Sequence, residues 1–369
     1  MSRMLIVPFV NLPLQFRSIE QELMEDFRRV GNGGMYILGA EVSEFEERIK
    51  EYCDVKHAIG VGNGSDALFL CMKGLGIGRG DEVIAPANSF IATAWTIIAA
   101  NATPVLVDVQ EDYNIDPNAV CRAITSKTKA IIVVHMAGRP AAMDEINALA
   151  KKNGIYVLED AAQAIGARYR GRPVGSLGTA AGFSLHPLKN LGVYGDGGFV
   201  TTNDDELAKD LLLLRNHGLA NRNKCDIWGY NSRLDTLQAA FALTKLKYLN
   251  GWNDRCRGIA RMYREGLKNC VVVPDDNSWE INVYHNFIIR TTKREELRVY
   301  LENCGIGTAV HYPVPIHLQP AASGLGYAKG SFPKSEMYAS TMLSLPIYPE
   351  LDDAAVNYVI ECVGTFLKA

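Results

Sequence analysis

Residues 183–198 read FSLHPLKNLGVYGDGG and set Lys189 between an apolar, strand-like run and a glycine-rich turn. A lysine in such a place can lose part of its hydration, which lowers its pKa and makes its amine a nucleophile towards aldehydes. Ser184 lies five residues before Lys189, which is not the spacing of neighbours on one helix face. We therefore expect an extended or turn geometry, in which Ser184 can bind a phosphate while Lys189 reaches an aldehyde.

A second informative segment, about thirty residues upstream, ends in a carboxylate. Residues 154–160 read GIYVLED, an apolar and β-branched run that predicts a strand finishing at Asp160. A reactive lysine and a strand-end aspartate are the two groups that pyridoxal 5'-phosphate (PLP) needs, one for its aldehyde and one as counter-ion for its ring nitrogen. A helix cap is the structural alternative for Asp160.

Strand-like runs alternate with helical patterns over most of the first two hundred residues. The runs lie at 57–61, 82–86, 103–108, 130–135, 155–159, 181–185 and 198–202. They lack polar alternation, which indicates strands buried on both faces of a mostly parallel sheet. Ligands bind beyond the carboxyl ends of such strands, and Gly64, Ser65, Phe90, Asp160 and Lys189 all follow strands.

The pattern changes at about residue 234. A long helical stretch reaches about residue 268, followed by short strands at 271–273 and 287–289 and helices near 294–303 and 351–367. We predict an α/β protein with a large PLP-binding domain, residues 1–250, built on a mostly parallel mixed sheet. A smaller α+β domain would comprise residues 251–369.

A glycine-rich turn at Gly60-x-Gly62-x-Gly64-Ser65 follows one strand and precedes a helix. Glycines let the backbone approach a phosphate, and the N-terminus of the helix offers free N–H groups. A dinucleotide fingerprint is the rival interpretation, but the acids that would bind the ribose, Asp81 and Glu82, precede the second strand instead of ending it. A simple strand–helix turn also stays open.

The composition narrows the class of protein. The chain has 369 residues, 48% of them hydrophobic, and a net charge of -3, so there is no basic excess to hold a nucleic acid. No run approaches the ~20 apolar residues that span a bilayer. The eight cysteines and seven histidines show no metal-ligand spacing, and the N-terminal MSRMLIVP is too short for a signal peptide. We expect reduced thiols, no metal, no membrane contact and a cytoplasmic location.

Several long motifs in one order carry a resemblance that runs nearly end to end. They include YILGAEV at 36–42, GNGSDAL at 62–68, EDAAQA at 159–164, the segment 184–198, RNHG at 215–218, GYNSRLD at 229–235 and the His311-Tyr312-Pro313 loop. With these motifs the chain resembles the DegT-type family of PLP-dependent sugar aminotransferases. That family is a branch of the fold type I, or aspartate aminotransferase-like, enzymes, so the resemblance implies this fold.

The resemblance also implies roles for individual residues. Lys189 would bond to the cofactor aldehyde and carry protons, Asp160 would pair with the pyridinium, and Gln163 would lie beside the 3'-oxygen of the ring. Phe90 would stack on the ring, while Asn231 would reach the phosphate from the other subunit of a homodimer with shared active sites. The phosphate ligands would be Gly64, Ser65 and Ser184. His186, which stands where many relatives carry an aromatic residue, and His311 and Tyr312 are the candidate substrate contacts.

The implied reaction transfers an amino group from L-glutamate to a keto-sugar nucleotide, in amino-sugar biosynthesis for polysaccharides or antigens. The KNLG…GDGG form, with HYPVPIHLQ at 311–319, is more similar to members that aminate C3 than to C4-aminating members. The alternatives are C4 amination, another ketone such as a keto-inositol or small keto-phosphate, and a PLP-fold regulator without catalysis. A sugar dehydratase is disfavoured because dehydratase relatives replace the lysine with histidine.

Overall fold

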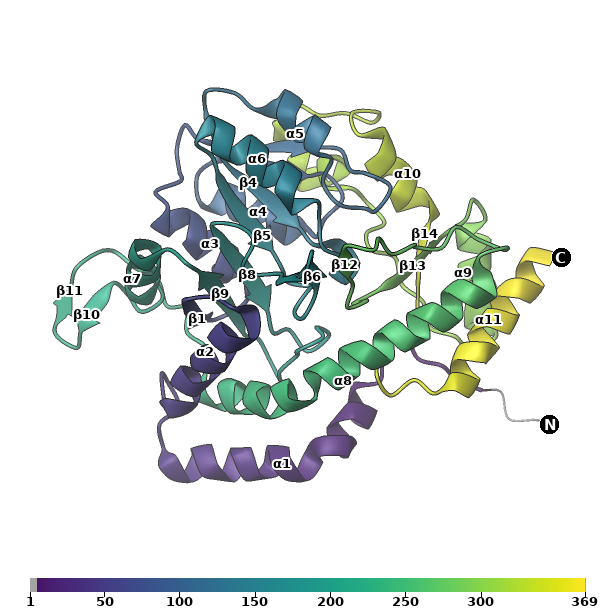
Figure 1. Ribbon diagram of the computed structural model, residues 1–369, viewed down its shortest axis with the longest axis horizontal. Coiled ribbons are helices and arrows are strands. Elements are labelled where there is room, and N and C mark those ends of the chain that lie inside the picture. Colours follow the sequence, from purple (N-terminus) through teal and green to yellow (C-terminus); the bar gives the residue numbers. More distant parts are fainter. Residues whose placement is uncertain (1–4, 369) are drawn as a thin grey trace.

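A seven-stranded sheet forms the centre of the computed structural model, which describes residues 5–368 (Figure 1). The strand order is β1-β9-β8-β5-β4-β2-β3, and β9 runs antiparallel to both of its neighbours while the other contacts are parallel. The strands are β1 (His57–Val61), β2 (Glu82–Pro86), β3 (Thr103–Val107), β4 (Thr128–Val134), β5 (Tyr156–Asp160), β8 (Ala180–Ser184) and β9 (Gly198–Thr202). All seven predicted strands are confirmed, as is the mostly parallel mixed sheet.

Helices cover both faces of this sheet, which explains why its strands are apolar throughout. One face packs against α3 (Gly64–Gly74), α4 (Ile91–Ala99) and α7 (Asp205–Leu214). The other face packs against α2 (Ala40–Cys53), α5 (Pro117–Ala123), α6 (Met143–Asn153) and the first half of α8 (Thr236–Leu267). Strands enclosed in this way bury side chains in both directions, so a run such as that of β4 needs no polar alternation.

The second half of α8 belongs to a different apolar cluster, together with α9 (Arg294–Asn303), α11 (Asp353–Lys368) and the antiparallel pair β13 (Phe287–Arg290) and β14 (Met342–Leu345). Figure 1 shows α8 running from the central sheet to α9 and α11. Along α8 the sheet-side cluster reaches Leu249 and the other begins at Cys256. The helix is continuous across the boundary expected near residue 250, and the division into two domains stays a prediction.

One predicted strand is wrong. Residues 271–273 form no strand, and only Val272 bridges Arg290. The valine run is β-prone, but Pro274 follows it directly and has no N–H to extend a ladder.

The remaining elements lie outside the seven-stranded sheet and the helices named above. They are α1 (Leu12–Gly33), α10 (Pro333–Thr341), β6 (Arg168–Tyr169), β7 (Arg172–Pro173), β10 (Leu219–Asn221), β11 (Lys224–Cys225), β12 (Glu280–Ile281), and the short 3-10 turns η1 (Met136–Gly138), η2 (Ile316–Leu318) and η3 (Pro320–Leu325). Within residues 5–368, no helix combines the length and apolar character needed to cross a membrane. The first four residues of the N-terminal segment judged too short for a signal peptide lie outside the described residues.

Candidate active site

A cavity of about 380 Å³ opens where several parallel strands reach their carboxyl ends. It lies beyond β1, β2, β4, β5 and β8, as expected for ligand sites in open α/β sheets. Ten of the eleven residues expected to bind cofactor or substrate line it: Gly64, Ser65, Phe90, Asp160, Gln163, Ser184, His186, Lys189, His311 and Tyr312. Residues up to 248 positions apart in the sequence, from Gly64 to Tyr312, therefore meet in one place.

Asp160 is the last residue of β5 and is buried at the floor of this cavity. The hydroxyl of Thr93 donates to its Oδ2 at 2.7 Å, and the N–H of Ala162 donates to its Oδ1 at 3.4 Å. Burial raises the pKa of Asp160, while the bond from Thr93 opposes that rise. A cationic N–H placed against this carboxyl group would favour its ionised form further.

Lys189 lies on a turn between β8 and β9, and its backbone N–H donates to the carbonyl of His186 at 2.8 Å. Burial lowers the pKa of its amine, and the nearby charge of Asp160 partly opposes this. The neutral amine, which is the nucleophilic form, is therefore more populated than on an exposed lysine.

The N-terminus of α3 and the end of β8 form a narrow cradle at another part of the wall. Asn63 caps α3 by accepting from the N–H of Asp66 at 2.8 Å, while the first N–H groups of a helix have no intrahelical acceptor. A Cβ at Gly64 would lie 2.7 Å from the Cβ of Ser184, so only glycine fits this approach without a shift. Free N–H groups, a helix N-terminus and a serine hydroxyl together suit a phosphate.

Gln163 and two aromatic rings form a further stretch of the wall. The Oε1 of Gln163 accepts from the N–H of Ala137 at 2.7 Å, and its Nε2 donates to the hydroxyl of Tyr312 at 3.1 Å. The rings of Phe90 and Tyr312 are 5.6 Å apart between centroids. Phe90 is 55% exposed although it is a large apolar residue, because its ring faces the cavity instead of the core.

Three histidines line the cavity, and two of them, His311 and His186, are expected substrate contacts. His311 is half-buried, its Nδ1 lies 2.9 Å from the hydroxyl of Ser344, and burial lowers its pKa to about 4. His186 is exposed, and its Nδ1 accepts from the N–H of Leu188 at 3.3 Å. With Nδ1 acting as an acceptor, the proton of a neutral His186 ring is on Nε2, which can donate to a ligand.

Asn231 is the expected site residue that does not line the cavity. It is exposed on the surface, and its backbone bridges that of Asn216. Figure 1 shows the β10–β11 hairpin, which precedes Asn231 in the chain, projecting from the body of the molecule. The side chain of Asn231 is therefore not part of the cavity of its own chain.

Three residues at the site were not expected there. Thr93 bonds to Asp160 across 67 residues of sequence, and Asp196 and His285 line the cavity. Asn63 also lines it, within the turn expected after the first strand. Thr93 and His285 lie within apolar runs that read as ordinary helix and strand-edge sequence. The position of Asn63, directly before a helix, is a signal that could have identified it as a cap.

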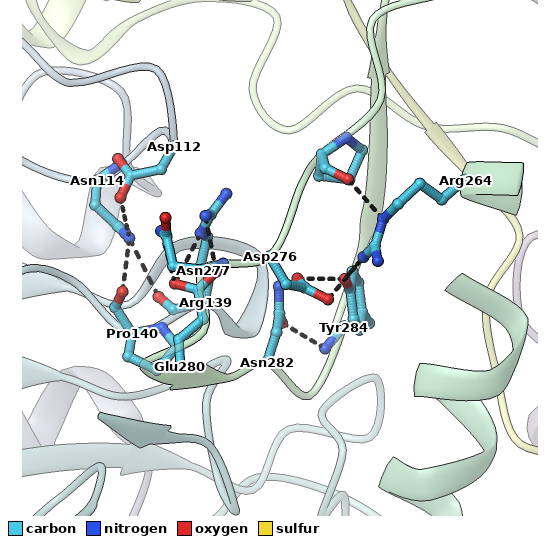
Figure 2. Close-up of polar contacts among 11 residues, drawn as sticks. Asp112, Asn114, Arg139, Pro140, Arg264, Asp276, Asn277, Glu280, Asn282 and Tyr284 are labelled. Carbon is cyan, nitrogen blue, oxygen red and sulfur yellow. Dashed lines mark hydrogen bonds and ion pairs between the residues drawn. The ribbon is translucent and has the colours of Figure 1, made fainter. Parts of the chain in front are cut away.

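A polar network fixes the segment that presents His285 (Figure 2). The guanidinium of Arg139 forms two bonds with the buried carboxylate of Glu280, at 2.7 and 3.1 Å. Arg264 bonds to Asp276 and to the hydroxyl of Tyr284, and the N–H of Val283 donates to the carbonyl of Gly138 at 3.2 Å. The segment 276–286 is thereby held against η1, which also contacts Gln163.

Comparison with known proteins identifies the family. The model of the DegT/DnrJ/EryC1/StrS aminotransferase family matches residues 17–364. The chain belongs to this family. It is an aminotransferase of the PLP-dependent fold type I class, as the resemblance implied.

Individual relatives match along almost their whole length. The dTDP-3-amino-3,6-dideoxy-alpha-D-galactopyranose transaminase of Aneurinibacillus thermoaerophilus is 46% identical, covering 98% of this chain and 99% of its own. A pleiotropic regulatory protein of Geobacillus stearothermophilus is 45% identical with the same coverage. The crystal structure of S. venezuelae DesV in complex with a ketimine intermediate superposes with a TM-score of 0.97, at 43% identity and 99% coverage of both chains.

The cavity fits the cofactor of this family. PLP needs a lysine amine, an anion for its ring nitrogen and a cradle for its phosphate, and the cavity offers Lys189, Asp160 and the N-terminus of α3. The close approach of Gly64 to Ser184 leaves the cradle free of side-chain carbons where a phosphate would need backbone N–H groups.

Proposed function

We propose that this enzyme transfers the amino group of L-glutamate to C3 of a keto-sugar nucleotide. The observation that carries the proposal is that Lys189 and Asp160 line one cavity, which the exposed His186 also lines. The Aneurinibacillus relative is named for a 3-amino sugar carried on dTDP, which supports both the substrate class and the carbon atom. We place the enzyme in amino-sugar biosynthesis, in the cytoplasm.

Each residue of the cavity has a separate task in this proposal. PLP, when bound, supplies an electron-withdrawing ring that weakens the Cα–H bond of an attached amino acid. Lys189 would take that proton on its neutral Nζ and deliver it to a different carbon, the one that carries the aldehyde of the cofactor, acting first as base and then as acid. Asp160 holds the proton on the ring nitrogen. The N–H groups of α3 and the hydroxyls of Ser65 and Ser184 hold the phosphate.

The substrate side of the cavity comprises His186, His311 and Tyr312. Burial keeps His311 neutral at physiological pH, so its ring can share hydrogen bonds with sugar hydroxyls without attracting a counter-ion. His186 presents its Nε2 proton at the exposed border, where the sugar nucleotide would enter. These three residues are the ones we expect to discriminate between keto sugars.

We further propose that the active enzyme is a homodimer in which Asn231 reaches the phosphate of the partner's cofactor. Several large apolar side chains are exposed on the single chain, and a partner subunit would cover them. Trp228, only three residues from Asn231, is 93% exposed, and Trp95 on α4 is 51% exposed. Tyr36 and Ile37 are 55% and 40% exposed. A second copy that covers these residues would bring Asn231 to a cavity.

The test is a screen of keto-sugar nucleotides against the pyridoxamine form of the enzyme, following loss of its absorbance. The proposal predicts turnover of a 3-keto sugar nucleotide, with glutamate restoring the starting form. Turnover of 4-keto sugars alone would move the reaction to C4, and turnover of a keto-inositol or keto-phosphate alone would replace the sugar nucleotide as substrate.

The Geobacillus relative is named as a pleiotropic regulatory protein, and this name is the one observation that favours a regulatory role as the second candidate function. A protein that only binds PLP would need no lysine of lowered pKa facing an aspartate, so Lys189 and Asp160 favour catalysis. Formation of 2-oxoglutarate from glutamate by the purified protein would decide for the enzyme. A protein that binds PLP but yields no 2-oxoglutarate would decide for the regulator.

A further inference from the structure

A second and smaller cavity, of about 60 Å³, lies behind Lys189. Three residues line both this cavity and the large one: Leu188, Lys189 and His285. They form the partition between the two spaces. Lys189 therefore lies in a wall between two cavities, and its long, flexible side chain can extend into either of them.

The two cavities differ in charge. The large cavity is lined by the carboxyl groups of Asp160 and Asp196. Among the described residues, no aspartate or glutamate lines the small one. Apart from Lys189, its polar members are three amides, two phenols, an indole, a thiol and the ring of His285. An amine that moves from the large cavity to the small one leaves Asp160, whose charge favours the protonated amine, and enters a neutral environment.

The small cavity also has a lining residue with an unused acceptor. The Nδ2 of Asn190 donates to the Oδ1 of Asn253 at 2.9 Å and to the carbonyl of Val283 at 3.1 Å. Reversing this amide would set its oxygen against two acceptors, so its orientation is fixed. Its Oδ1 is buried and has no partner. Buried acceptors are nearly always bonded, so this one is suited to a donor that arrives during the catalytic cycle.

The walls of the small cavity are held from outside. Lys245 on α8 donates to the carbonyl of Gly192 at 2.7 Å, which fixes the turn after Lys189, and also to Gln15 at 3.2 Å. The pair of Arg139 and Glu280 holds the segment of His285 (Figure 2). The partition therefore keeps its place while a side chain moves across it.

We propose that in the pyridoxamine phosphate form of the enzyme, between its two half-reactions, Lys189 places its amine in the small cavity and donates a hydrogen bond to the Oδ1 of Asn190. The inference rests on the proposed role of Lys189. The movement would clear the large cavity for the incoming keto sugar, and it would hold the free amine away from Asp160 until the amine returns to take a proton.

A crystal structure of the wild-type enzyme with pyridoxamine phosphate, to which Lys189 cannot bond, tests this directly. The proposal predicts the Nζ of Lys189 within hydrogen-bond distance of the Oδ1 of Asn190. An Nζ that stays beside Asp160, with the ligand bound in the large cavity, would overturn it. If pyridoxamine phosphate did not bind in the large cavity at all, that result would contradict the proposed function. This inference would then also be wrong, because it rests on that function.

A solution measurement tests the same point through the small cavity alone. Cys256 on α8 lines it, and Cys256→Met would fill it. A filled small cavity would destabilise the complex with pyridoxamine phosphate, in which the amine of Lys189 occupies that cavity. We therefore expect the dissociation constant of pyridoxamine phosphate to rise about tenfold and that of PLP to change less than about twofold. Cys362→Met, an equal enlargement of a buried cysteine on α11 that lines neither cavity, should change neither constant. Equal shifts for both ligands in Cys256→Met would contradict the inference.

Discussion

At the scale of single residues, burial shifts the pKa values of Asp160 and Lys189 in opposite directions. It raises the pKa of the carboxyl group and lowers that of the amine, so each group is driven towards its neutral form. A cofactor that bonds to the amine and brings a cationic ring nitrogen to the carboxyl group relieves both strains. Burial of the charged forms of these two groups is unfavourable in the chain without cofactor, and binding of PLP would make it favourable.

The counter-ion is tested by Asp160→Asn. This variant keeps the shape of the side chain but removes the charge that holds a proton on the ring nitrogen. PLP should still bind, while the glutamate half-reaction should slow about 100-fold or more, the range found when an oriented electrostatic partner is removed. Stopped-flow absorbance measures the half-reaction. As a control, Asp54→Asn changes an exposed helix-cap aspartate in the left-handed region, which asparagine tolerates, and should change nothing. A rate for Asp160→Asn within tenfold of wild type would contradict the role.

His311 gives a prediction about pH. Because its pKa is about 4 in the folded chain and near 6.5 when unfolded, the unfolded state binds the proton first as the pH falls. Stability contributed at this site is therefore present above about pH 6.5 and lost between that value and pH 4. NMR titration of the ring should show a neutral His311 down to about pH 5. A midpoint near 6.5 would contradict both the burial argument and the neutral substrate contact.

At the scale of elements, the cavity is made by the ends of strands and the start of α3. The buried strands fix the positions of their carboxyl ends, and the turns that follow them supply residues of the cavity. These are Gly64 and Ser65 after β1, Phe90 after β2, and Lys189 after β8. The approach of α3 to β8 is close, since Gly64 faces Ser184 without room for a Cβ.

Gly64→Ala tests the cradle. Its Cβ would force Ser184 and the start of α3 apart, which would weaken charge-assisted bonds to a phosphate. The dissociation constant of PLP should rise about tenfold or more, the equivalent of about 1.5–3 kcal/mol for one such bond. Fluorescence titration of the apoenzyme measures it.

The control for that substitution is Gly258→Ala within α8, where a Cβ would meet no atom within 4 Å. Alanine is the better helix former, so this variant should bind PLP normally and gain about 0.5–1 kcal/mol of stability. Equal PLP affinity in both variants would show that the contact of Gly64 with Ser184 does not form the cradle.

The sequence predicted the elements whose residues carry a local signal. The seven strands were predicted because enclosure on both faces leaves continuous apolar runs, and Lys189 and Asp160 because few other residue types can do their chemistry. The failed strand at 271–273 had the right propensity, but tertiary pairing stops at Val272. Thr93 and His285 were missed because their roles come from contacts that fold distant segments together, and no local pattern records them.

At the scale of the whole molecule, the proposed homodimer is the point to test. Asn231 lies outside its own cavity, and large apolar side chains such as Trp228 are exposed on the single chain. A homodimer with exchanged residues would account for both observations, because in an isologous interface each copy would complete the other.

Mixing two inactive variants tests that exchange. Lys189→Ala disables the cavity of its own chain, while Asn231→Ala would disable the cavity of its partner. A mixed dimer then holds one cavity with both residues, so random reassociation should restore about 25% of wild-type activity, with half of the dimers mixed and one of two sites intact. If Asn231 acted within its own chain, every cavity would lack one of the two residues, and Asn231→Ala would not be complemented by Lys189→Ala. Recovery near zero would therefore contradict the exchange.

The central claim is that the ε-nitrogen at position 189 bonds to PLP. Borohydride reduction of the holoenzyme, followed by digestion and mass spectrometry, measures it most directly. The account predicts one phosphopyridoxyl group, on the peptide that contains Lys189. The same label on another lysine, or no covalent label on a protein that has bound PLP, would contradict it.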